Sequence, residues 1–267
     1  FINNDQIKFY ELNSSNTVTN NANTYIYSVS GSTASLTNPT TAWYRDDFQT
    51  GDAISGVFPV LSQTNVVAGA STFNWTCSNG SGGSSTNGHN QDVIIAAPNG
   101  NYGLIQAGSA NVAFQFKHVL SKVSVNLIVG TGFTTSEIVG SVVELNNFKL
   151  SGVVNVANGS ASPTGAVTFS FQPTKLSTSN TVTGKTVVSS YEAFIMPQTI
   201  TAASASKTTI VTVTLNGVKF YGQLSADKLF AAGEHNVLNI TLNKVGLALS
   251  TELVDWTYGG SYDMDLH

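Results

Sequence analysis

The residues that could support catalysis or metal binding lie in two short stretches of the sequence. His89 and Asp92 form an HxxD pattern, which could provide a general base and the carboxylate that orients it. Asp46, Asp47 and Asp52 could supply carboxylate oxygens to Ca²⁺. However, no GxSxG nucleophile motif is present, and the acidic stretch lacks EF-hand spacing. Solvated loops are therefore the favoured interpretation of both stretches.

The remaining histidines and the cysteine give no pattern typical of a metal site. His118 shares the strand parity of Phe116 and Leu120, which favours a hydrogen-bonded histidine in or beside a core. His235 and His267 have no partners at metal-ligand spacing. Cys77 is the only cysteine, so no intramolecular disulfide can form. The sequence thus predicts a protein that is not an enzyme and holds no metal or other cofactor.

A pair of aromatic residues suggests an alternative function. Trp43 and Tyr44 precede Asp46 and could stack on a sugar ring, as in a cell-surface carbohydrate-binding module. The competing interpretation is that both side chains fill a core, and the same holds for Trp75.

The charge composition excludes two classes of partner. Charged residues make up 10% of the 267 positions, the formal net charge is −4, and Arg45 is the only arginine. Nucleic acids and anionic membranes are both bound through clustered lysine and arginine, which this chain lacks. No stretch approaches the length of about 18 apolar residues that a membrane-spanning helix needs.

Alternation of apolar and polar residues predicts an all-β fold. The pattern is clear over residues 166–172, 209–215 and 237–243, and Asn216-Gly217 predicts a two-residue hairpin turn. Pro197 should end its strand or mark a sheet edge, because proline cannot donate a hydrogen bond to a sheet. Further strands are expected at 6–12, 24–30, 53–61 and 92–97, and single helical turns at 135–139 and 225–231.

Residues 112–129 alternate with a break in phase. Phe114, Phe116 and His118 share one parity, whereas Val123 and Val125 share the other. One extra residue near Ser121 would produce this shift within one long strand, so the pattern predicts a β-bulge or a brief turn there. We place a domain boundary just ahead of this strand, near Gly108, which gives an N-terminal β domain over 1–108 and a C-terminal β-sandwich domain over 109–267.

Four segments, in this order, carry a family resemblance. They are FKHVLSKV (116–123), YEAFIMPQT (191–199), AAGEHNVLNITL (231–242) and VDW (254–256). Together they make the chain similar to the Bacteroides-type fimbrillin family of Mfa-like surface proteins. The resemblance is good over roughly 110–258 and loose before it.

The resemblance implies two tandem transthyretin-like β-sandwich domains in a fimbrial subunit or fimbrillin-like adhesin. It also implies a place at the cell surface, in the outer membrane or a fimbrium. Other fimbrial subunits would be the partners, joined by strand exchange, and a receptor on the host or on another bacterium is left unidentified. Membrane attachment would come only through a lipid anchor on a residue outside this sequence. Stalk subunits of the family are typically matured by cleavage after an arginine, and the chain departs from this pattern because Arg45 is its only arginine. A tip or accessory subunit and a non-polymerising surface relative therefore remain alternatives.

The last residues have the pattern of a strand that could be donated to another subunit. Tyr258, Tyr262, Met264 and Leu266 share one parity, and two aspartates lie on the other. Backbone hydrogen bonds and alternate side chains would then complete a neighbour's sheet. Two alternatives remain, namely an edge strand added to its own sheet and a disordered tail.

Overall fold

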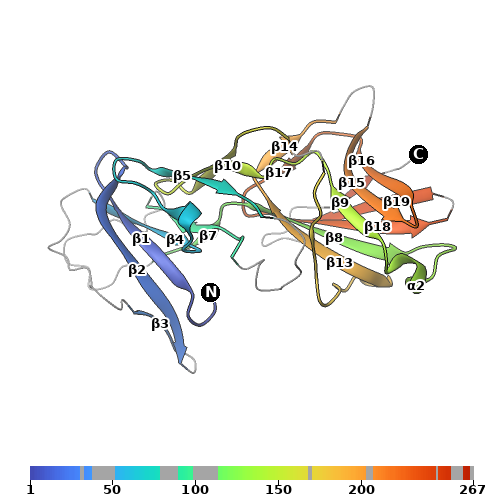
Figure 1. Cartoon of the computed structure of the whole chain (residues 1–267), viewed down its shortest axis with the longest axis horizontal. Coiled ribbons are helices and arrows are strands. Elements are labelled where there is room, and N and C mark those ends of the chain that lie inside the picture. Colours follow the sequence, from blue (N-terminus) through green and yellow to red (C-terminus); the bar gives the residue numbers. More distant parts are fainter. Residues whose placement is uncertain are drawn as a thin grey trace. The chain divides into compact units, whose positions relative to one another are not determined.

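The computed structural model describes residues 1–30, 33–37, 52–78, 90–98, 114–167, 170–202, 207–244, 246–253 and 261–264. Nearly all of the regular structure consists of β-strands, as predicted (Figure 1). Contacts group the chain into two compact units, each built from three stretches of sequence. Unit 1 contains 1–75, 92–119 and 153–162, and unit 2 contains 76–91, 120–152 and 163–267. Gly108 lies outside the described residues, so the division into domains at that position stays a prediction.

Unit 1 is built on an antiparallel sheet with the strand order β3-β2-β1-β4-β6-β7. Its strands are β1 (Gln6–Leu12), β2 (Val18–Ser30), β3 (Thr33–Thr37), β4 (Ala53–Phe58), β6 (Ile94–Ala96) and β7 (Lys117–His118). Ile7, Phe9, Ile54 and Phe58 form a buried cluster, and Phe116 packs against it. Alternation puts Ile7 and Phe9 on the same face of β1, which explains why the pattern at 6–12 located this strand.

The break in phase within 112–129 has a different cause from the predicted bulge. β7 ends at His118 in the sheet of unit 1, and β8 (Ser121–Val129) begins in a sheet of unit 2. The single-strand interpretation is therefore wrong: the chain leaves one unit after Val119 and enters the other at Leu120. Phe116 and Val125 both face a core, but the cores are different.

Unit 2 contains a larger sheet with the order β12-β13-β8-β18-β19-β20. Its strands besides β8 are β12 (Thr174–Lys175), β13 (Val187–Ile195), β18 (His235–Asn243), β19 (Gly246–Leu253) and β20 (Ser261–Met264). β8 pairs antiparallel with β13 and parallel with β18, so it lies in the centre. The other neighbouring pairs are antiparallel.

A second layer covers one face of this sheet. β9 (Val142–Leu145), β15 (Thr208–Leu215) and β16 (Val218–Leu224) form a sheet with the order β16-β15-β9. Side chains of both sheets share one buried core, which includes Val125 and Leu127 of β8 and Val211 and Val213 of β15. Unit 2 is therefore a β-sandwich, as the alternation predicted.

Local sequence signals account for several boundaries in unit 2. β15 and β16 are joined through Asn216 and Gly217, whose φ angles of 50° and 80° are those of a primed hairpin turn. β13 ends two residues before Pro197. The helical turn expected at 135–139 is α2 (Thr135–Ile138), where Thr134 and Glu137 form a capping box.

Two expected elements differ from the structure. The predicted helical turn at 225–231 is wrong, because β17 (Lys228–Phe230) lies there and pairs with β14 (Gln198–Ile200). Of the expected strand at 166–172, the described part has one β-bridge, between Phe171 and Leu145. The remaining elements are β5 (Thr72–Thr76), β10 (Ser151–Asn155), β11 (Ser160–Pro163) and the 3₁₀ turn η2 (Ser62–Thr64).

Candidate functional site

The predicted donor segment contributes the last strand of the large sheet. Within it, β20 pairs antiparallel with β19, with Tyr262 opposite Thr251 and Met264 opposite Leu249. This is the pairing expected if the segment adds an edge strand to its own sheet. Tyr258 and Leu266 lie outside the described residues. The assignment of these four residues to a donated strand stays a prediction.

β20 is connected to the sheet more weakly than its neighbour. Four residue pairs join it to β19, whereas eight join β19 to β18. It is the last strand in the order β12-β13-β8-β18-β19-β20, so β19 is its one neighbour in this sheet. If β20 left, the backbone groups of β19 that it pairs with would form an open edge.

The face of the large sheet opposite the sandwich core carries buried polar side chains. Asn126 on β8 donates from Nδ2 to Oδ1 of Asn239 on β18, at 2.9 Å. Its Oδ1 accepts from Ser190 Oγ on β13 at 2.7 Å and from Asn180 Nδ2 at 3.0 Å. Hydrogen bonds thus connect the side chains of three adjacent strands, and each of the three side chains on those strands is at least 96% buried.

A second polar cluster lies further along the same face. Lys122 Nζ is 2.7 Å from Glu192 Oε1, and His235 Nε2 is 2.7 Å from Ser124 Oγ. Glu192 is 3.5 Å from Ser124 Oγ. The pKa of His235 is lowered to about 4, mainly by burial and also by the positive charge of Lys122, while the negative charge of Glu192 partly opposes both effects. His235 is therefore neutral at pH 7.

This cluster is not arranged as a hydrolase triad. Ser124 has no exposed surface, so a substrate could not reach its hydroxyl. The carboxylate of Glu192 contacts Ser124 and Lys122, whereas in a triad it would orient the far nitrogen of the imidazole. The arrangement satisfies buried polar groups, which is a structural role.

The low pKa of His235 predicts that acid destabilises the fold. The unfolded chain binds this proton near pH 6.5 and the folded chain only near pH 4, so the unfolded state gains protons first. Stability should fall between these values, by about 1–2 kcal/mol after allowance for partial exposure. Glutamine does not titrate, so the free energy of unfolding of His235→Gln should depend less on pH, as measured by urea unfolding from pH 7 to pH 4. The same pH dependence in the variant and the original protein would contradict the assignment.

The other histidine candidates are located as follows. His118 Nδ1 lies 2.8 Å from Asp92 Oδ2, and the His118 side chain is 34% exposed, so the prediction of a hydrogen-bonded boundary histidine is confirmed. Asp92 therefore has a partner other than the His89 of the HxxD pattern. His89 lies outside the described residues.

The acidic and aromatic candidates fall mostly outside the described part of the chain. Trp43, Tyr44, Asp46 and Asp47 are not described, so a glycan contact at the two aromatic residues stays a prediction. Within the described ranges, no group of three or more His, Cys, Asp or Glu side chains could hold a metal ion. Trp75 is 1% exposed, which confirms that it fills a core.

Sequence reasoning missed both polar clusters, because their members are far apart in the chain. Ser124 and His235 are separated by 111 residues, and Asn126 and Asn239 by 113. Alternation in the sequence shows which positions of β8 and β18 are polar, but it does not show that these two strands pair in parallel.

Among the described residues, no helix is both long and apolar enough to span a bilayer.

Comparisons with known proteins agree with this fold. A family model described as fimbrillin-like matches residues 1–256. The chain is 27% identical over 180 residues to Fim1C of Bacteroides uniformis, a proposed fimbrium subunit. That match covers 63% of this chain and 55% of Fim1C, so it spans about half of the relative's length.

Solved structures share the architecture over almost the whole chain. A proposed cell adhesion protein of Bacteroides uniformis superimposes with a TM-score of 0.71 at 21% identity, over 96% of this chain and 93% of its own. The tip fimbrial protein Mfa3 of Porphyromonas gingivalis, truncated at its C-terminus, gives 0.51 at 9% identity, over 95% of each chain. These identities establish a common fold, and the family model covers nearly every residue. The chain belongs to the fimbrillin-like family.

Proposed function

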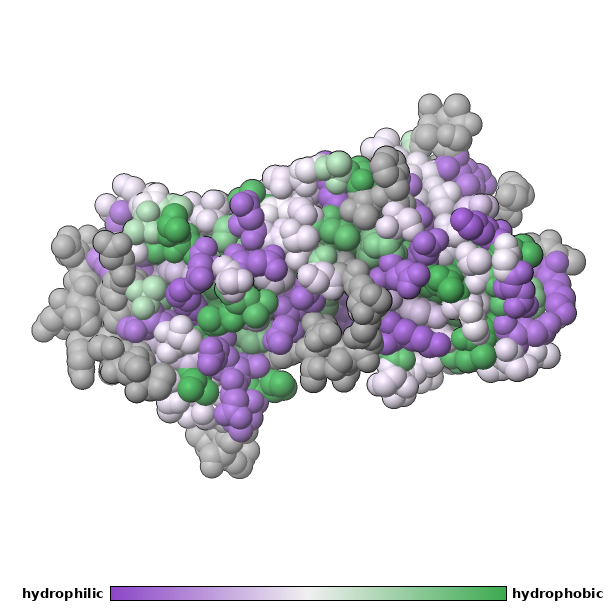
Figure 2. All heavy atoms as spheres, in the orientation of Figure 1, coloured by the Kyte–Doolittle hydropathy of each residue, from purple (hydrophilic) through white to green (hydrophobic). Residues whose placement is uncertain are grey.

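We propose that this chain is a non-enzymatic subunit of a cell-surface fimbria, or a fimbrillin-like adhesin. The observation that carries the proposal is the family match over residues 1–256. The interior supports it, because Asn126, Ser190 and Asn239 bond to one another and Ser124 has no exposed surface. Hydrophilic residues are spread among hydrophobic ones over the face seen in Figure 2, as on an ordinary water-exposed surface.

Other fimbrial subunits are the proposed partners, and the fimbrium or outer membrane is the proposed location. A lipid anchor outside this sequence would provide any membrane attachment. The net charge of −4 gives no electrostatic reason to bind nucleic acid. The receptor would be a surface molecule of the host or of another bacterium.

Strand exchange at the edge of the large sheet is the proposed mode of assembly. β20 is held by four residue pairs to β19, so its release exposes few backbone groups. The corresponding segment of another subunit would restore the same hydrogen bonds and the same alternation of side chains. The donor residues would then be Tyr258, Tyr262, Met264 and Leu266.

Deletion of residues 258–267 tests this mode of assembly. We expect loss of incorporation into fibres, while the melting temperature of the monomer falls by less than about 4 °C, because few contacts are lost. Electron microscopy of fibres and calorimetry of the purified monomer give the two readouts. A synthetic peptide of residues 258–267 should bind the shortened protein, whereas a scrambled peptide of the same composition should not.

Two results would contradict the donor assignment. One is normal incorporation of the shortened chain into fibres. The other is a fall in melting temperature of more than about 10 °C, which would show that the segment is an integral part of its own sheet.

A further inference from the structure

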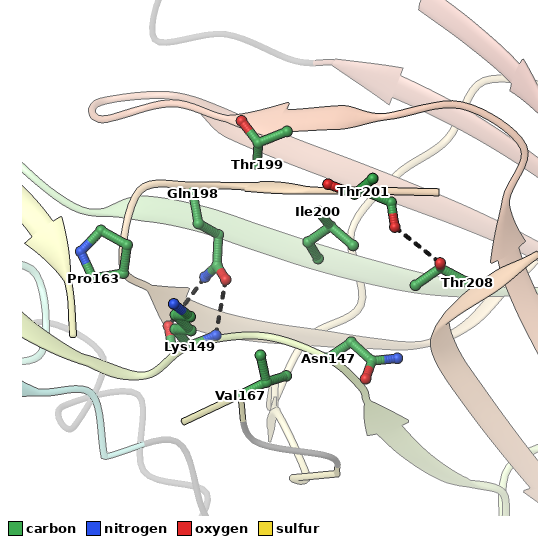
Figure 3. A pocket seen from close by; sticks show the side chains of 9 residues that line it. All are labelled: Asn147, Lys149, Pro163, Val167, Gln198, Thr199, Ile200, Thr201 and Thr208. Carbon is green, nitrogen blue, oxygen red and sulfur yellow. Dashed lines mark hydrogen bonds between the residues drawn. The ribbon is translucent and has the colours of Figure 1, made fainter. Parts of the chain in front are cut away.

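A pocket of about 340 Å³, lined by both polar and apolar side chains, lies in unit 2 and contains no residue of β19 or β20. Three segments meet around it: the stretch from Asn147 to Lys149, β14 with the following Thr201, and the first residue of β15 (Figure 3). Pro163 and Val167 complete the lining. Its volume is at the lower end of the range of small-molecule sites, about 300–1,000 Å³.

Hydrogen bonds inside the wall fix the shape of this pocket. The buried Gln198 accepts from the backbone N–H of Lys149 at 2.9 Å and donates to the carbonyls of Lys149 and Met196 at 3.0 and 2.9 Å. Thr208 Oγ1 donates to the carbonyl of Thr201 at 3.0 Å. Asn147 has a φ of 66° and donates from Nδ2 to the carbonyl of Thr209 at 2.8 Å. The lining is thus formed before any ligand arrives.

Other polar groups of the lining are available to a ligand. They are the ammonium of Lys149, Oδ1 of Asn147 and the hydroxyl of Thr201. None of these atoms has a hydrogen-bond or ion-pair partner among the residues that the structure describes. The exposed side chain of Thr199 lies on the opposite face of β14 from Gln198 and Ile200. The pocket therefore offers one positive charge, one amide acceptor and one hydroxyl that can donate or accept.

These groups match the chemistry of a sugar that carries one carboxylate. The single ammonium suits one negative charge, and the amide and hydroxyl groups suit the hydroxyls of a sugar ring. Ile200, Val167 and Pro163 add apolar surface for the C–H face of the ring. A site for a nucleotide would need more positive charge, since its phosphates are usually held by several cations or by a row of backbone N–H groups.

We propose that this pocket binds an acidic sugar residue at the end of a glycan. Lys149 pairs with the carboxylate, Asn147 Oδ1 accepts from a ring hydroxyl, and the Thr201 hydroxyl binds another ring oxygen. The proposal deepens the adhesin function and rests on it for the source of the glycan, which would be on a neighbouring cell. Binding of the sugar itself requires only the pocket.

Titration calorimetry with the purified full chain provides the test. The probes are sialyllactose and a glucuronic acid disaccharide, with neutral lactose as the comparison. We expect dissociation constants on the order of 1 mM for at least one acidic probe, and binding of lactose at least ten times weaker. Saturation with neither acidic probe up to about 20 mM, or equal binding of lactose, would overturn the proposal.

Matched variants assign the binding to this pocket. Lys149→Met keeps the side-chain stem and the backbone bonds to Gln198 but removes the ammonium, so we expect acidic-probe binding to weaken at least tenfold. Thr201→Val should weaken it by a smaller factor. Lys219→Met changes the net charge equally at an exposed position on β16 and should leave binding unchanged. Equal effects of Lys149→Met and Lys219→Met would overturn the assignment, as would displacement of the sugar by an equal concentration of inorganic phosphate.

The two proposals fail independently. Lys149→Met should still be incorporated into fibres, because the pocket contains no residue of β19 or β20. Fibre formation without sugar binding would reject the pocket alone. Sugar binding by a chain that never enters fibres would reject the fimbrial function and leave the pocket in place.

Discussion

Phe148→Ala should destabilise the protein by about 4 kcal/mol, as other truncations of fully buried phenylalanines do. Phe148 has no exposed surface and lies in the core of unit 2. Its ring meets Phe230 edge-on at 5.1 Å between centroids, and Phe171 at 6.3 Å. The substitution therefore removes buried apolar area and two aromatic contacts, and it leaves a cavity that the rigid strands around it cannot fill.

Urea unfolding of the variant and of a matched control measures this effect. Phe220→Ala is the control, because Phe220 is half-buried on the edge strand β16. This variant should lose less than half as much free energy of unfolding as Phe148→Ala. A loss below about 1 kcal/mol for Phe148→Ala would show that unit 2 repacks freely around this position. Phe148 also lies between Asn147 and Lys149, so the variant should bind the acidic sugar less well even where it remains folded.

Short-range signals predicted the parts of the fold that depend on neighbouring residues. β1 was located at Gln6–Leu12 because alternation reflects which face of a strand is buried. The hairpin at Asn216 and Gly217 was predictable because both residues adopt positive φ more readily than others. The end of β13 before Pro197 follows from the missing N–H of proline.

Long-range pairing accounts for what could not be predicted. Alternation over 112–129 records only which parity is buried, so it cannot distinguish a bulge from a chain that leaves one sheet and enters another. At 225–231, pairing of β17 with β14 outweighs the local helical signal, since Gln198 and Phe230 are 32 positions apart and meet only in the folded chain.

The candidate sites also divide into those with a local sequence signal and those that depend on long-range contacts. The strand pattern of the terminal segment was visible in the sequence, and the structure contains a strand at Ser261–Met264. The pocket was not visible, because Lys149, Thr199 and Thr208 come from segments that no motif connects. Side chains brought together only by sheet packing leave no signal in a single sequence.

Asn126→Ala should destabilise unit 2 by about 3 kcal/mol, although asparagine contributes little to hydrophobic burial. The substitution removes the acceptor of the Ser190 hydroxyl and the donor to Asn239 Oδ1. Both partners are more than 95% buried, so neither can turn to bulk water. Each buried polar group left without a partner costs about 1–3 kcal/mol.

A double-mutant cycle with Asn239→Ala separates this effect from simple loss of packing. The double variant removes donor and acceptor together, so it should be more stable than the sum of the single effects predicts, by about 1 kcal/mol or more. Strict additivity in urea unfolding would show that the two amides do not interact.

The expected coupling also bears on assembly, through the register of the parallel pair β8–β18. In that register Asn126 lies opposite Asn239, and a slip by one residue would move Asn239 to the other face of the sheet. β18 in turn pairs with β19 over eight residues, so its position determines where the edge strand lies. Asn126→Ala should therefore reduce fibre incorporation under conditions where the monomer is still folded, whereas Phe148→Ala, with an expected loss of stability at least as large, should not. Equal incorporation of the two variants would show that the polar network contributes stability alone.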